Sequence, residues 1–334
     1  MSNIIKAALM LGGLGAVFGA LLAVVGRLFS VPEDARKSAL RECLPGANCG
    51  GCGFAGCDAY AEAVASGSAP VGKCPVGGDA AAQKMADIMG VTVEAVEPLV
   101  ATVMCRGSLD SCHVRFEYEG PQSCRSASLA AFGDKDCRFS CLGYGDCAVK
   151  CPFGAIKVGS DRLARIDASL CQGCGKCVET CPRGVIALVP RKNPVHVVCS
   201  ALDKGKTVRD HCTSGCIGCG KCARSCDFGA LTMQNNLPHI DAEKCVGCMR
   251  CADSCPTGAL QANEEMRRRA VIRYDRCTGC GSCQDACRYN AVMGNIGHPH
   301  GVIAWNCVGC GQCEDKCPEK CIRMVHGENL RARK

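Results

Sequence analysis

The chain has 334 residues, enough for two or three ordinary domains, and 35 of them are cysteine. A disulfide framework is disfavoured as the main scaffold, because the cysteine count is odd, the chain is long and such frameworks belong to small secreted domains. The net charge of +7 is modest and only 4% of residues are aromatic. The sequence has no stripe of basic and aromatic residues of the kind that indicates nucleic-acid binding.

The first predicted element is a transmembrane helix over Ala7–Gly26, within an anchor of residues 1–30. These twenty residues carry no charge and span about 30 Å as a helix, the thickness of a bilayer's hydrocarbon. No small-residue cleavage site follows, which disfavours a signal peptide. Lysine and arginine lie mostly after the helix, so we expect the rest of the chain on the cytoplasmic side of a prokaryotic plasma membrane.

Residues 31–103 contain a self-contained set of four cysteines. Glycines between them give the backbone room to fold around one 4Fe-4S cube. Strong helix formers predict helices over 58–66 and 80–89, and a third helix or a strand over 93–103. We expect a small helical domain with one cluster, whose ligands are Cys49, Cys52, Cys57 and Cys74.

A spacing of Cys-x2-Cys-x2-Cys-x3-Cys then recurs along the chain. It presents three thiolates to one cube while the fourth reaches a different cube, so these motifs should occur in pairs. Five regular copies begin at Cys171, Cys216, Cys245, Cys277 and Cys307, and an irregular copy precedes them. The sequence therefore predicts an α+β protein with three tandem two-cluster ferredoxin-like domains, over residues 104–192, 193–262 and 263–334.

Short apolar runs follow the motifs, at 154–158, 184–189, 229–233 and 258–260, and others precede second motifs, at 165–167 and 239–241. They predict two short hairpins around two helical turns in each unit. Crossed ligation predicts five further ligand sets: Cys171, Cys174, Cys177 with Cys151; Cys216, Cys219, Cys222 with Cys255; Cys245, Cys248, Cys251 with Cys226; Cys277, Cys280, Cys283 with Cys317; Cys307, Cys310, Cys313 with Cys287.

Structural zinc is the main alternative for these motifs. It favours two Cys-x-x-Cys pairs separated by a longer loop, whereas here a third cysteine follows at once. Ligating thiolates must stay reduced until iron arrives, which indicates a reducing compartment. Because the core is poor in aromatic residues, we expect the domains to be loose or unfolded without iron.

The irregular copy lacks one standard ligand. Cys124-x12-Cys137-x3-Cys141 matches Cys199-x12-Cys212-x3-Cys216, which places Tyr144 where the second unit has Cys219. Cys137 is the nearest replacement, and Tyr144 is expected to pack rather than to tune a cluster. The predicted ligands of this cluster are Cys137, Cys141, Cys147 and Cys181.

Seven clusters use 28 of the 35 cysteines and no histidine. Two interpretations remain open for the others: buried small hydrophobic residues, or an eighth cluster drawn partly from Cys105, Cys112 and Cys124, whose spacing fits no local cluster loop. The unassigned cysteines are Cys43, Cys105, Cys112, Cys124, Cys199, Cys212 and Cys321.

The anchor, the run Leu44-Pro-Gly-Ala-Asn-Cys49-Gly-Gly-Cys52 and the run Cys141-Leu-Gly-Tyr-Gly-Asp-Cys147 together resemble the B subunit of the Rnf complex. The resemblance implies a membrane-bound ferredoxin:NAD+ oxidoreductase. Electrons from reduced ferredoxin would enter through this subunit and pass to membrane subunits and a flavin-bearing, NAD-binding subunit, driving Na+ or H+ export. The resemblance weakens over residues 273–325, which shorter family members lack.

No Gly-x-Gly-x-x-Gly follows a strand, and neither a P-loop nor an acid–base constellation is evident. We therefore expect no NAD site and no complete active site in this chain. Its predicted function is one-electron transfer between cubes. Two alternatives remain: a polyferredoxin subunit of another redox complex, and an iron–sulfur scaffold or storage protein.

Overall fold

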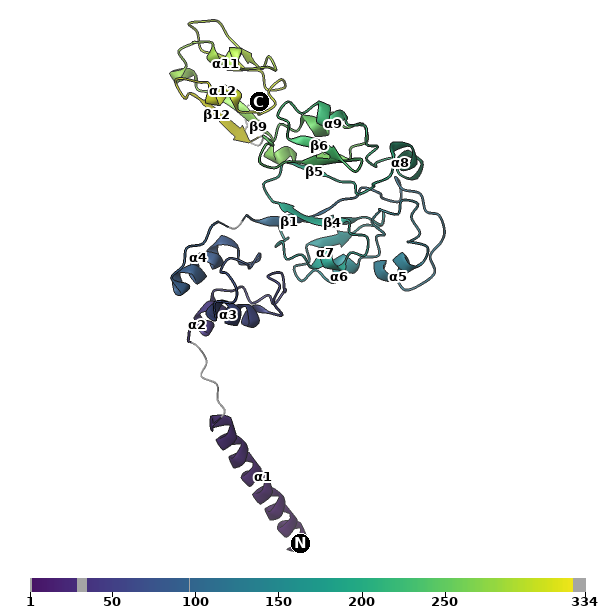
Figure 1. Ribbon diagram of the computed structural model, residues 1–334, viewed down its shortest axis with the longest axis vertical. Helices are drawn as coiled ribbons and strands as arrows, with labels where there is room; N and C mark the ends of the chain where they lie inside the picture. Colours follow the sequence, from purple (N-terminus) through teal and green to yellow (C-terminus); the bar gives the residue numbers. More distant parts are fainter. Residues whose placement is uncertain (1, 29–34, 96, 327–334) are drawn as a thin grey trace.

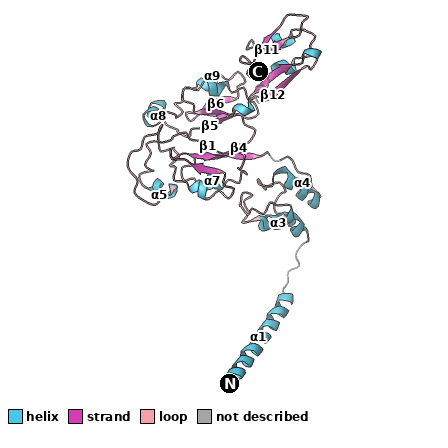
Figure 2. Ribbon diagram, turned by 180° about the vertical axis from the view of Figure 1, so that it is seen from behind, coloured by secondary structure: helices cyan, strands magenta, loops and turns pink. Residues whose placement is uncertain are grey.

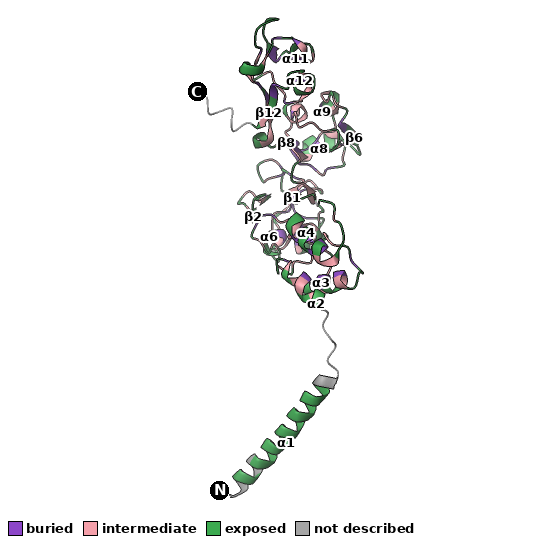
Figure 3. Ribbon diagram, turned by 90° about the vertical axis from the view of Figure 1, so that its left-hand side faces the viewer, coloured by how far each residue is buried: buried purple, intermediate pink, exposed green. Residues whose placement is uncertain are grey.

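The computed structural model describes residues 2–28, 35–95 and 97–326. Figure 1 shows an elongated molecule, with helix α1 (Ser2–Leu28) at one end, then a helical domain, then units that contain strands. Within α1, Leu9–Gly26 has a mean hydropathy of 2.2 and none of it is buried, as Figure 3 shows. One helix long and apolar enough to cross a bilayer is thus present where the sequence predicts it.

The helical domain contains α2 (Ala35–Glu42), α3 (Cys57–Ala65) and α4 (Gly78–Met89). Helices α3 and α4 confirm the predictions for 58–66 and 80–89, whereas the sequence does not predict α2. Leu40 of α2 is fully buried with Tyr60 and Met85. This small core holds the loops that carry Cys49–Cys57 and Cys74.

The remaining described residues form six antiparallel strand pairs, arranged as three repeats (Figure 2). In each repeat the first strand pairs with the last, and an inner hairpin lies between them. The outer pairs are β1 (Leu99–Val103) with β4 (Ile186–Pro190), β5 (Val195–Val197) with β8 (Leu260–Ala262), and β9 (Arg268–Ile272) with β12 (Ile322–His326). The inner pairs are β2 (Ile156–Val158) with β3 (Ala164–Ile166), β6 (Leu231–Gln234) with β7 (Leu237–Ile240), and β10 (Val292–Met293) with β11 (Gly301–Val302).

The pairing of β1 changes one expectation. Of the two structures considered for residues 93–103, a strand forms at Leu99–Val103, and it belongs to the first ferredoxin unit rather than to the helical domain. The reason is that its partner β4 lies at the far end of that unit. Strand β1 precedes the boundary expected between residues 103 and 104, whereas its partner β4 follows that boundary.

A short helix starts inside each cysteine motif. These helices are α6 (Asp146–Val149), α7 (Lys176–Thr180), α9 (Lys221–Arg224), α10 (Arg250–Asp253), α11 (Ser282–Asp285) and α12 (Gln312–Asp315). The two helices of each unit pack against one another. Two 3-10 turns, η1 (Glu264–Met266) and η2 (Tyr274–Arg276), flank β9.

The first and second units each contain an insertion before their first motif. In the first unit it includes α5 (Cys124–Leu129), and in the second it includes α8 (Gly205–His211). Figures 1 and 2 show α5 and α8 on the same side of the molecule, away from the helical domain. The insertions contact one another, because Thr213 N–H donates to Ser111 O at 2.9 Å and an isolated antiparallel bridge joins Cys112 to Cys212.

Candidate iron–sulfur centres

The backbone of each motif is bent into a tight loop by glycine. In the loop that starts at Cys171, Gly173 has φ +64° and a Cβ there would lie 2.6 Å from Leu99 O. Gly175, at φ +78°, then caps α7, so that Cys177 lies in the helix and Cys181 follows it. Only glycine combines this φ with so close an approach of the neighbouring strand.

The thiols gather across the two motifs of a unit. Burial, and after it the nearby thiols of Cys171, Cys174 and Cys151, raise the pKa of Cys177 to about 11. The same crossed proximity places Cys181 beside Cys147, Cys255 beside Cys222, Cys226 beside Cys248, Cys317 beside Cys283 and Cys287 beside Cys310. This is the arrangement that crossed ligation of two cubes requires.

The environment of these sulfurs fits a 4Fe-4S cube. Backbone N–H groups point at several of them: Ala101 donates to Cys171 Sγ at 3.4 Å and Ala291 donates to Cys287 Sγ at 3.3 Å. Such bonds to ligating sulfur are a main way in which proteins set cluster potentials. Among the described residues, no three His, Cys, Asp or Glu side chains converge closely enough to hold a single metal ion.

The four cysteines of the helical domain are held by a polar framework that the sequence did not indicate. Asn48 Oδ1 accepts the N–H of Cys57 at 2.9 Å, and Gly77 N–H donates to Cys74 Sγ at 3.3 Å. The Tyr60 hydroxyl donates to Pro70 O at 2.9 Å, which ties the segment before Cys74 to α3. Cys74 thereby lies within electrostatic range of Cys52 and Cys49.

In the irregular first motif, a cysteine outside the expected set lies beside the expected ligands. Asp146 accepts the N–H groups of Cys124 and Arg125, each at 3.0 Å, and the Ser123 hydroxyl at 2.9 Å. Since Asp146 directly precedes Cys147, this cap fixes the start of α5 beside the motif. Burial raises the pKa of Cys147 to about 12, with Cys141 and then Cys124 as the nearest contributing thiols.

Cys137 is directed elsewhere. Burial raises its pKa to about 11, and the thiols that add most to the shift are Cys212 and Cys199 of the second unit. It also packs against the apolar cluster that contains Cys199. The structure thus brings Cys141, Cys147 and Cys181 together as expected, but Cys124 rather than Cys137 joins them.

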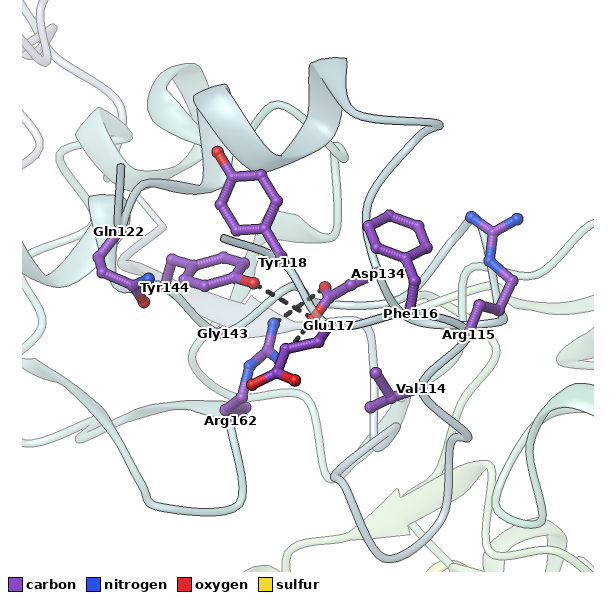
Figure 4. A pocket seen from close by; sticks show the side chains of 10 residues that line it. All are labelled: Val114, Arg115, Phe116, Glu117, Tyr118, Gln122, Asp134, Gly143, Tyr144 and Arg162. Carbon is purple, nitrogen blue, oxygen red and sulfur yellow. Dashed lines mark hydrogen bonds and ion pairs between the residues drawn. The ribbon is translucent and has the colours of Figure 1, made fainter. Parts of the chain in front are cut away.

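Tyr144, which takes the place of a ligand, points into a surface cavity of about 540 Å³ (Figure 4). Its hydroxyl donates to Asp134 Oδ2 at 3.2 Å, and its ring lies under the Arg162 guanidinium at 4.3 Å. Arg162 donates two bonds to the buried Asp134, at 2.6 and 3.0 Å, and two to Leu142 O, at 2.7 and 3.2 Å. Tyr144 therefore has the packing role expected of it.

Two of the unassigned cysteines have local roles. Cys43 directly follows α2, and its thiol donates to Ala39 O at 3.3 Å. Cys321 is buried with its sulfur 3.5 Å from that of Cys317. The contacts described for Cys43 and Cys321 therefore involve no other unassigned cysteine.

Matches to known families agree with this arrangement. A family described as a putative Fe-S cluster matches residues 44–76, a 4Fe-4S binding domain matches 163–186, and 4Fe-4S dicluster domains match 215–259, 244–291 and 270–324. The match over 244–291 joins the second motif of one unit to the first of the next, whereas strand pairing separates them. Fold and thiols together define an iron–sulfur electron-transfer protein built from ferredoxin-type 4Fe-4S domains.

Curated relatives specify the family. The chain is 45% identical over 70% of its length to the B subunit of the Na+-translocating ferredoxin:NAD+ oxidoreductase complex of Acetobacterium woodii, covering 71% of that protein. It is 43% identical to the B subunit of the proton-translocating ferredoxin:NAD+ oxidoreductase complex of Clostridium ljungdahlii, over 72% of this chain and 85% of the other. It is 38% identical to the B subunit of the ion-translocating oxidoreductase complex of Methanosarcina acetivorans, over 73% of this chain and 92% of the other. The chain belongs to this family, the B subunits of Rnf-type ion-translocating oxidoreductase complexes, as its motifs predict.

Proposed function

We propose that the chain conducts electrons from reduced ferredoxin to the membrane subunits of a ferredoxin:NAD+ oxidoreductase, through one cluster in the helical domain and two in each of three ferredoxin-like units. The ligand sets are those expected from the sequence, except that Cys124 replaces Cys137 in the first unit. Each cube supplies reversible one-electron storage. The part of the chain is to hold the thiolates, shield them from water and direct N–H groups at sulfur.

The observation that carries this proposal is the contact between the helical domain and the first unit. The Cys49-Gly-Gly-Cys52 loop lies on the loop of Cys174, where a Cβ on Gly51 would be 2.8 Å from Cys174 O. Cys49 is near enough to Cys174 to raise its pKa further, after the larger effect of burial. Two predicted centres from different domains thus meet edge to edge.

The opposite end of the molecule is suited to receive electrons. Cys280 of the third unit is solvent-exposed, which is true of only one other described cysteine, Cys219. Beside it, Ile296 is 83% exposed and its Cγ1 lies 3.8 Å from the position of a Cβ on Gly281. An exposed thiolate next to an exposed apolar side chain suits the docking of a small electron carrier, because docking there would bury apolar area beside the cluster.

At the other end, α1 would anchor the helical domain on the cytoplasmic face of the membrane. Gly15 and Gly19 form a Gly-x-x-x-Gly pair on this helix, and a Cβ at either position would meet no atom within 4 Å in the chain itself. Such small-residue stripes let another transmembrane helix approach closely. Electrons would leave here towards membrane subunits and, through them, a flavin-bearing NAD-binding subunit.

Ferredoxin-dependent NAD+ reduction by membranes tests the proposal. Membranes from cells that lack this chain should lose the activity and regain it when the full chain is returned, while a version without residues 1–30 should restore little. Full activity without the chain would show that it serves another redox complex. Co-purification of flavin-bearing subunits with the tagged chain is the parallel readout.

A further inference from the structure

Lys135 is the only fully buried lysine or arginine among the residues that the structure describes. It lies in the insertion of the first unit, where an isolated antiparallel bridge joins it to Val114. Its Nζ donates to Gly107 O at 2.6 Å and to Arg162 O at 2.9 Å. Both acceptors are uncharged carbonyl groups, so neither supplies the negative charge that a buried ammonium group needs.

The buried carboxylate next to Lys135 in sequence is already neutralised. Asp134 is 1% exposed, and the Arg162 guanidinium donates to both of its oxygens, at 2.6 and 3.0 Å (Figure 4). In the described part of the chain, no carboxylate forms an ion pair with Lys135 itself. The group of Asp134, Lys135 and Arg162 therefore carries one net positive charge, which Lys135 supplies.

This charge lies behind the loop that begins at Cys141. Gly107, one of the two acceptors, donates its N–H to Cys105 Sγ at 3.2 Å, and the same sulfur accepts the N–H of Cys141 at 3.3 Å. The other acceptor packs against Gly143, where a Cβ would overlap the carbonyl oxygen. Burial lowers the pKa of Lys135, and the thiolate of Cys141 opposes this more than any other group does.

The second unit repeats this backbone arrangement without the cation. Cys199 Sγ accepts the N–H of Cys216 at 3.2 Å, which matches the bond to the first cysteine of the motif in the first unit. Lys135 stands six residues before Cys141, whereas the residue six positions before Cys216 is the exposed Asp210. The buried cation therefore belongs to the irregular motif and not to the fold that the units share.

We propose that Lys135 raises the reduction potential of the first centre of the first unit, the cluster proposed for Cys141, Cys147, Cys181 and Cys124. Reduction adds one electron and breaks no bond, so it makes an anionic cluster more negative, and a cation held nearby favours the reduced form. The ammonium group in turn gains the negative charge that its other neighbours lack. Lys135 acts through its field at the cluster and is a positioning residue, not a ligand. The inference rests on the proposed function, because it needs a cluster at this loop.

A raised potential would make this centre a resting place for electrons in the relay. The second centre of the same unit contains Cys174, whose loop lies against the helical domain. Electrons that arrive from the other ferredoxin units would therefore be held one centre before the contact through which they leave.

Potentiometric EPR titration of the full-length chain, purified in detergent without oxygen, tests this role. The signal of the first centre is identified as the component that is missing from Cys147→Ala. Lys135→Gln keeps N–H donors but removes the charge, so the ratio of reduced to oxidised centre at a fixed ambient potential should fall about tenfold, which is about 59 mV for one electron. Lys157→Gln makes the same charge change at an exposed position of β2 and should leave the ratio within about twofold.

Asp134→Asn separates an effect of charge from an effect of structure. It removes a negative charge with little change in shape, so the same ratio should rise about tenfold. Lys135→Gln combined with Asp134→Asn should return the ratio close to the parental value. A role in packing alone predicts shifts of the same sign, because both changes loosen the same loop. If Lys135→Gln loses the centre, the direction of the shift in Asp134→Asn still decides between the two.

The possible outcomes distinguish this inference from the proposed function. An unchanged ratio in a Lys135→Gln chain that keeps its full iron content, or a ratio that does not rise in Asp134→Asn, would overturn the role of Lys135 alone. A Cys147→Ala chain that loses no iron would refute the ligation on which the proposed function depends, and this inference with it.

Discussion

Replacing Arg162 by methionine should loosen the first centre of the first unit selectively. Arg162 bonds the Asp134 carboxylate and Leu142 O, which lies next to Cys141 (Figure 4). The Asp134 side chain is 2% exposed and that of Arg162 is 23% exposed. Removing one partner of a buried ion pair costs about 3–5 kcal/mol, and the partial exposure of Arg162 favours the lower end, about 3 kcal/mol.

If iron leaves through local opening of this loop, about 3 kcal/mol corresponds to a release about 150-fold faster. The assay is the anaerobic transfer of iron to a coloured chelator, where the variant should show a fast phase of about four iron atoms per chain. Arg165→Met is the matched control, because Arg165 pairs with Asp161 at 2.5 Å on the surface, with side chains 59% and 21% exposed. Its loss should change the rate by no more than about twofold. Release from Arg162→Met at the parental rate, or equal acceleration of all the iron, would refute the reasoning.

Three further predictions follow from contacts elsewhere in the chain. Gly51→Ala should strain the contact with Cys174 O by about 1–3 kcal/mol. It should slow reduction of the helical-domain centre, measured by rapid-freeze EPR, and leave the iron content unchanged. Unchanged reduction kinetics would place the electron path elsewhere. Ile296→Glu should slow reduction of the chain by ferredoxin by about tenfold but leave its reduction by dithionite unchanged. Leu129→Glu, at an equally exposed position (84% against 83%), should affect neither rate. Equal effects of the two changes would exclude a docking role for Ile296. Removal of iron should abolish most far-ultraviolet circular dichroism outside α1 because cluster binding is coupled to folding, and a native-like spectrum of the iron-free chain would contradict this.

The ferredoxin units are predictable because their information is local. The spacing within each motif specifies a loop, a helical turn and a crossed ligand, and the apolar run after it specifies a strand. The gathering of Cys177 with Cys151 and of Cys222 with Cys255 needs nothing beyond this.

The exceptions arise where a distant partner decides. Sequence order groups Leu99–Val103 with the helical domain, because its partner β4 lies beyond both motifs of the first unit. Spacing alone does not indicate that Cys124 lies beside Cys147, because the Asp146 cap on α5 brings it there.

The repeat shows the same limit. Equal spacing aligns Cys124 with Cys199, yet matching N–H donors make Cys105 the counterpart of Cys199. The insertions differ in length, so spacing alone pairs the wrong cysteines.

The most direct test of the relay is the reduction of the full-length chain by ferredoxin. The chain, purified in detergent without oxygen, is mixed with a substoichiometric amount of reduced ferredoxin while the visible absorbance of its clusters is followed. The account predicts rapid bleaching that scales with the ferredoxin added. Clusters that stay oxidised under ferredoxin, although dithionite reduces them, would contradict it and would make the chain a relay for a different donor.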